Sequence, residues 1–116
     1  MEFQKSELYK TIKKVKVEGQ NISYSQGMPK QFKKLPLITY SNFINDPEFC
    51  FQNDIYSQEI STQVDIWSRG SSINTLIFKS LCDVMLKEGW QLVTAQDVER
   101  KDTIFRIMTK FRRIIE

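Results

Sequence analysis

The chain of 116 residues contains no histidine. It therefore has no imidazole to act as a general base, to activate a serine or cysteine nucleophile, or to bind zinc or non-haem iron. The two cysteines, Cys50 and Cys82, lie far apart, so neither a zinc ribbon nor a CxxC redox motif is present. The four glycines stand singly, and neither GxGxxG nor a Walker-type phosphate loop occurs. These absences weigh against an enzyme, and we expect no cofactor and no metal.

Long apolar runs are also missing. No stretch reaches the ~18 residues that a transmembrane helix needs, and the segment MEFQKSELYK lacks the apolar region of a secretory signal. We therefore expect a protein that stays in a cytoplasm, does not bind membranes and keeps its thiols reduced. Hydrophobic residues still make up 41% of the chain, which is enough for the core of a single domain over residues 1–116.

The acidic residues do not form a recognisable catalytic or metal site. One cluster contains Asp46 and Glu48, and the other contains Asp97, Glu99 and Asp102. Both clusters fall in predicted turns, where such residues are common for backbone reasons. A catalytic pair needs a concave site that shifts one pKa, and residues 45–54 lack the ligand spacing of a calcium loop. We predict that the protein has no catalytic residues.

The N-terminal part is predicted to be a helix followed by a loop. Leu8, Ile12 and Val15 recur at helical spacing within residues 1–18, and Gly19 suits the end of that helix. Residues 19–34 are polar and have no period, which indicates a long loop or arm.

Residues 35–116 are predicted to form a sheet and its core helix. Alternation and turn residues predict strands at 35–40, 57–68, 90–96 and 103–114, with irregular segments at 41–56 and 97–102. Between the second and third of these strands, an amphipathic helix begins with a serine cap near Ser71 and ends at Gly89. The order is α-β-β-α-β-β. The predicted fold class is α+β, with a mainly antiparallel sheet and one long helix on one face.

Charge is divided into three blocks along the chain. The net charge of +3 is the sum of +5 over residues 1–34, −5 over 35–65 and +3 over 66–116. The blocks are either a chance of composition or a sign that unlike sides of neighbouring copies meet. Trp67 and Asp65 alternate away from the core residues of their strand, and Trp67 either forms a subunit contact or packs beneath a loop. The candidate subunit-interface residues are Asp65, Trp67, Arg69, Asp46, Glu48, Asp54, Lys13 and Lys14.

A second group of basic residues lies near the C-terminus. The candidates for facing DNA, a ring lumen or a partner are Arg106, Lys110, Arg112 and Arg113. Phe105 and Phe111 alternate onto the opposite face, which argues against a platform that stacks bases. Contact with phosphates remains the alternative function, in which these cations and the lysines at 10–16 serve a small nucleic-acid-binding module.

Residues 35–116 resemble the tail completion (tail terminator) proteins of long-tailed bacteriophages and related prophage elements. The resemblance rests on an ordered set of features: Pro36, Ile38 and Tyr40; Asn53 and Asp54; the run Gln63 to Ser68 (QVDIWS); the amphipathic segment Ile73 to Met85; and Gly89. The basic N-terminal helix carries no motif of that family.

This resemblance implies a structural virion protein with an α+β fold. Such a protein assembles as a ring, usually of six copies, at the head-proximal end of the tail tube, where it stops tube growth and joins tail to head. The implied partners are further copies of the chain, the tail tube protein, the head-completion (stopper) protein and, in contractile tails, the sheath protein. DNA passes through the lumen without sequence-specific binding. The implied location is the virion tail or neck, assembled in the cytoplasm of the bacterial host.

Overall fold

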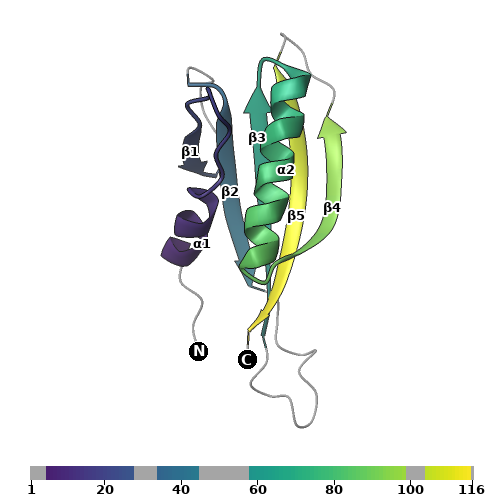
Figure 1. Ribbon diagram of the computed structural model, residues 1–116. Coiled ribbons are helices and arrows are strands. Elements are labelled where there is room, and N and C mark those ends of the chain that lie inside the picture. The colour runs from purple at the N-terminus through teal and green to yellow at the C-terminus, as the bar shows by residue number, and fades with distance from the viewer. Residues whose placement is uncertain (1–4, 28–33, 45–57, 99–103, 116) are drawn as a thin grey trace.

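A five-stranded sheet, with β3 (Gln58–Ser68) in the middle, forms the body of the molecule (Figure 1). The computed structural model describes residues 5–27, 34–44, 58–98 and 104–115. The other elements are α1 (Lys5–Ile12), β1 (Ser23–Gln26), β2 (Leu37–Ile44), α2 (Ser71–Lys87), β4 (Gln91–Val98) and β5 (Phe105–Ile115). The predicted α+β class and the helix packed on the sheet are confirmed.

The sheet has the strand order β1-β2-β3-β5-β4 and is mixed. β2, β3, β5 and β4 pair antiparallel, and the predicted hairpin of the last two strands is present. β1, however, runs parallel to β2 along its whole length. The expected order α-β-β-α-β-β therefore lacks one strand, and the expectation of a mainly antiparallel sheet holds for every pair except this one.

The N-terminal helix is shorter than the predicted 1–18. α1 ends at Ile12. After it, hydrogen bonds of the 3₁₀ type run from the Lys14 N–H to the Thr11 carbonyl and from the Val15 N–H to the Ile12 carbonyl. Val15, which follows the helix, is nevertheless fully buried. The carbonyl of Val15 accepts a 2.6 Å hydrogen bond from the Tyr24 hydroxyl, which ties this turn to β1.

The segment expected to be one loop, residues 19–34, contains β1. The expected strand at 35–40 continues as far as Ile44, into the segment predicted to be irregular, and β4 continues through Val98 into the predicted turn. The rest of the predicted irregular segment and turn lies outside the described residues.

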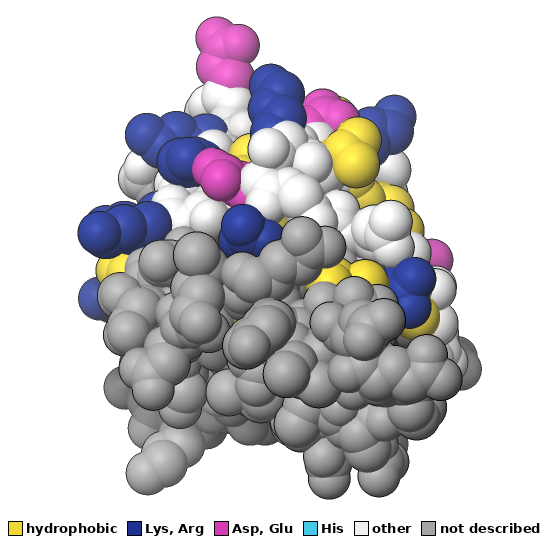
Figure 2. Space-filling view, turned by 90° about the horizontal axis from the view of Figure 1, so that it is seen from below, with side chains coloured by type: hydrophobic (Ala, Val, Ile, Leu, Met, Phe, Trp, Pro, Cys, Tyr) yellow, Lys and Arg dark blue, Asp and Glu magenta, His cyan; other side chains and the backbone are white. Residues whose placement is uncertain are grey.

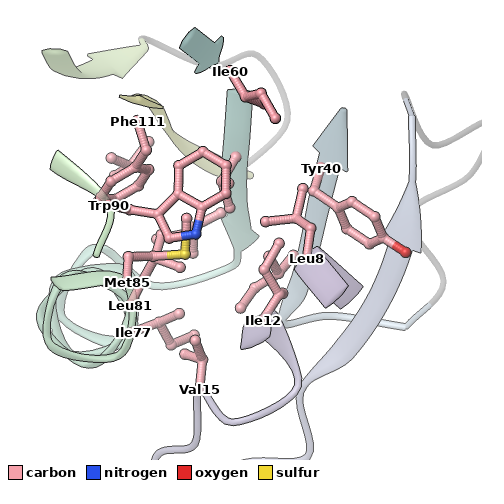
Figure 3. Packing of buried hydrophobic residues seen from close by; sticks show 14 residues of the cluster. Leu8, Ile12, Val15, Tyr40, Ile60, Ile77, Leu81, Met85, Trp90 and Phe111 are labelled. Atoms are coloured by element: carbon pink, nitrogen blue, oxygen red, sulfur yellow. The ribbon is translucent and has the colours of Figure 1, made fainter. Parts of the chain in front are cut away.

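α2 lies over the sheet and buries one side against it (Figure 1). Ile77, Leu81 and Met85 of the helix are fully buried, together with β3 residues and with Trp90, which directly precedes β4. Figure 3 shows Leu8, Ile12 and Val15 meeting this cluster from the N-terminal segment. α1 and α2 thus share one core on one face of the sheet.

The ends of α2 show one prediction to be wrong and one to be confirmed. The N-cap is Gly70 rather than a serine, and no side chain caps the first turn. Instead, the Ser68 hydroxyl donates to the Gly70 carbonyl at 2.7 Å. At the other end, Gly89 has φ +90°. This left-handed conformation ends a helix and suits glycine.

Candidate functional site

A buried ion pair stacked on an indole occupies the face of the sheet opposite the helices. Asp65 of β3 and Arg106 of β5 lie close together on that face, and the Arg106 Nε and Nη2 atoms donate to Asp65 Oδ2 at 3.2 and 2.5 Å. The guanidinium carbon lies 4.4 Å from the centroid of the Trp67 ring. The indole N–H donates to the Thr39 hydroxyl at 3.0 Å. Three neighbouring strands are therefore tied together by polar contacts on this face.

The groups of this cluster are buried within the subunit. Asp65, Trp67 and Thr39 are each 3% exposed. Gln63 reaches the same carboxylate, because its amide nitrogen lies 3.3 Å from both oxygens of Asp65. A charged pair this deep needs its hydrogen bonds to offset the cost of leaving water. The alternation correctly placed Asp65 and Trp67 on the face away from the helices, and their role at a subunit interface stays a prediction.

A shallow hollow of about 200 Å³ lies beside the ion pair. Thr39, Ser41, Gln63, Asp65 and Arg106 contribute to its walls. Asp65 and Arg106 in its wall pair with each other and carry opposite charges, so together they add no net charge to the hollow.

The four predicted DNA-facing residues do not all lie on one face. Lys110 and Arg112 alternate with Arg106 on the face opposite the helices, and Lys110 is exposed there. Arg106 itself is committed to Asp65. The Arg112 Nε atom donates to the side-chain oxygen of Gln91 at 3.2 Å. Arg113 falls on the helix-bearing face, with its guanidinium close to Gly89. Only part of the predicted group is thus placed together on one face.

Three of the remaining interface candidates lie among the described residues. Lys13, Lys14 and Arg69 are exposed, and the Lys14 ammonium lies 2.6 Å from a carboxylate oxygen of Glu88. This hydrogen bond and the Lys14 charge lower the pKa of Glu88. Figure 2 shows Lys and Arg side chains interspersed with acidic ones over the described part of one end, without a continuous basic patch. The other three candidates, Asp46, Glu48 and Asp54, lie outside the described residues.

Sequence reasoning missed a buried amide near the start of α2. Asn74 is 2% exposed, and within the described part of the chain neither its side-chain oxygen nor its side-chain nitrogen has a hydrogen-bond partner. It borders a hollow of about 390 Å³ whose walls also include Val98 and Phe105. An asparagine within an apolar helical pattern is the sequence signal that could have pointed to it.

The described part of the chain holds no group of three or more potential metal-ligating side chains. Within the same residues, no helix has both the length and the apolar character to cross a membrane.

Comparison with known proteins gives a match in structure and none in sequence. No protein-family model matches the chain, and no curated protein matches it either. A chain of a solved structure described as the virion of a native gene transfer agent (GTA) particle superposes with a TM-score of 0.60. The match covers 78% of this chain and 75% of that one, at 10% sequence identity. At that identity the similarity establishes a shared fold.

Proposed function

We propose that the chain is a structural subunit of a phage-like particle and, more specifically, a tail completion (terminator) protein. The observation that carries this proposal is the fold shared with a chain of the gene transfer agent virion over most of both lengths. In this role, copies form a ring at the head-proximal end of a tail, stop growth of the tube and provide the surface that joins tail to head.

The sequence pattern that resembles tail completion proteins supports the same proposal. Its features fall on consecutive elements of the fold: Ile38 and Tyr40 on β2, the QVDIWS run at the end of β3, and the amphipathic segment on α2. The residues of the pattern therefore lie on the strands and the helix that form the body of the fold, and not at scattered surface positions.

The proposed partners follow from the position of such a ring. They are further copies of the chain, in a ring of six, together with the tail tube protein, the head-completion protein and the sheath protein of a contractile tail. DNA crosses the lumen without sequence-specific contacts. The proposed location is the tail or neck of the particle, assembled in the cytoplasm of the bacterial host.

Tube growth in vitro tests the proposal. Purified tube subunits are polymerised with and without the protein, and tube lengths and ends are measured by electron microscopy. We expect shorter tubes, each with added density at one end. The control is the same amount of protein added after polymerisation, which should decorate ends without changing lengths. Unchanged lengths and bare ends at all protein concentrations would overturn the proposal.

The exposure of Lys110 on the face opposite the helices, beside Arg112, favours a second candidate, a nucleic-acid-binding module. Binding through phosphates weakens with salt by a log–log slope of about −0.9 for each contact with duplex DNA. Replacing Lys110 by Glu should then reduce both affinity and slope, whereas Lys79→Glu on the outer side of α2 should leave the slope unchanged. Absence of binding at low salt would exclude this candidate.

A further inference from the structure

Four rows of residues cross the whole sheet from edge to edge. Pairing places Ser23 level with Leu37, Trp67, Arg106 and Val98, so one row joins β1 to the end of β4. The next three rows run from Tyr24 to Asp97, from Ser25 to Gln96 and from Gln26 to Ala95. All four residues of β1 and the last four of β4 are therefore opposite ends of the same rows.

Among the described residues, the two edge strands carry few protective features, and β1 is half-buried except for the exposed Gln26. β4 is exposed at every residue except the half-buried Val98, and the only charged residue on either edge strand is Asp97. Proteins commonly protect sheet edges with lysine, proline or a bulge, because unpaired peptide groups can pair with another chain. β4 has one such device, a shift in register between Leu92 and Thr94. It lies outside the four rows, so residues 95–98 keep regular geometry.

The directions of the two edges also match. β1 runs with β2, β2 runs against β3, β3 against β5 and β5 against β4, so β1 and β4 point in opposite directions. When one copy is placed beside the next, edge to edge, β1 of one meets β4 of the other in antiparallel orientation. Contact between two different sides of identical subunits can close into a ring.

We propose that neighbouring copies pair through these edges, with β1 of one copy antiparallel to residues 95–98 of the next. This inference rests on the proposed ring and names the surface that builds it. Subunits in a closed ring lie at equal height along its axis. When the strands run parallel to that axis, each row of residues continues into the sheet of the next copy. Ser25 of one copy then lies opposite Gln96 of the other. A tilt of the strands shifts this register in steps of two residues, which keeps each side chain on its own face.

Engineered disulfides test this pairing directly. In a background carrying Cys50→Ser and Cys82→Ala, Ser25→Cys and Gln96→Cys are combined. Directly opposed antiparallel residues have Cα atoms ~4.5–5.5 Å apart, within the range that a disulfide spans. Inside one subunit the same positions are four strand spacings apart, about 19 Å, so no internal disulfide can form. A second cysteine pair, Ser25→Cys with Thr94→Cys, samples the shifted register on the same face.

Oxidation of the protein, alone and with tail tubes, should produce a ladder of covalent multimers that ends at the ring size. The matched control combines Ser25→Cys with Lys79→Cys on the outer side of α2, and should remain monomeric on denaturing gels. Capped tubes without a ladder from either cysteine pair would overturn the edge pairing and leave the tail role standing. A ladder without capped tubes would support the edge pairing and overturn the tail role. If neither a ladder nor capped tubes appear, the edge pairing and the tail role are both overturned.

Charge substitution gives a measurement that does not depend on disulfide geometry. Ser25→Lys with Gln96→Lys places like charges on the two edges, and assembly on tubes should fall by at least tenfold. Ser25→Lys with Gln96→Glu should restore it, since the charges are then complementary across the boundary. Because both positions lie at the edges, thermal unfolding of the separate subunit serves as the folding control. Equal assembly by both double variants would contradict the proposal.

Discussion

Replacing Asp65 by alanine is predicted to destabilise the isolated subunit strongly. The substitution removes both hydrogen bonds of the Arg106 guanidinium, whose side chain is only 13% exposed. Breaking a buried pair by removing one partner costs about 3–5 kcal/mol, because the remaining charge stays buried. The residual exposure of Arg106 gives water some access, so we expect a loss at the lower end, ~3 kcal/mol. Since small domains are stable by only about 5–15 kcal/mol, this loss is large.

Urea denaturation followed by tryptophan fluorescence is the assay, because Trp67 and Trp90 are both buried. The double variant Asp65→Ala with Arg106→Met removes both charges and should recover most of the lost stability. A loss below about 1 kcal/mol for the single variant would refute the account of the ion pair. A double variant no more stable than the single variant would do the same. Assembly of the variant is measured in parallel, because it tests the predicted interface role of Asp65. If Asp65 acted only between copies, its replacement would reduce assembly and leave the stability of the subunit unchanged.

Three further predictions concern α2 and its surroundings. Asn74→Leu should raise the free energy of unfolding by about 1–2 kcal/mol, as seen in urea titration, because it replaces a buried amide that has no partner among the residues the structure describes; a loss of stability would indicate a partner for that amide. Gly89→Ala should lower the melting temperature, at a cost of about 1 kcal/mol, because φ +90° is unfavourable for alanine; an unchanged melting temperature would argue against this strain. The lowered pKa of Glu88 predicts a stabilising contribution that is present above its ordinary value of 4.5 and is lost as pH falls through the lowered value. Lys14→Met should reduce this pH dependence, because Lys14 is the main cause of the lowered pKa, and an identical acid titration of the variant would contradict it.

The elements predicted best from the sequence are those with a clear apolar period. β3 and α2 were placed within a few residues because Ile60, Val64 and Ile66 alternate and Ile77, Leu81 and Met85 follow helical spacing. β1 was missed because its sequence, SYSQ, has no apolar alternation. Its pairing depends on a parallel neighbour, which lies more than ten residues further along the chain.

The candidate site was predictable in part. Alternation placed Trp67 and Asp65 on the face opposite the helices, and this was correct. Their burial could not be predicted, because the groups that pair with them, Arg106 and Thr39, come from other strands. The uncapped start of α2 was also hidden, because two serines follow Gly70 and either would serve as a cap by sequence.

The central position of β3 predicts that amide hydrogen exchange is slow in the middle of the sheet and fast at its edges. From Ile60 to Ser68 every side chain of this strand is buried except Gln63, and the strand is paired on both sides. Its amide protons should therefore exchange with deuterium only when the whole subunit unfolds, whereas those along the outer edges of β1 and β4 should exchange by local fraying. The pairing that protects β3 on both sides is absent at the outer edges of β1 and β4, so peptide groups there become accessible by local opening at little cost in free energy.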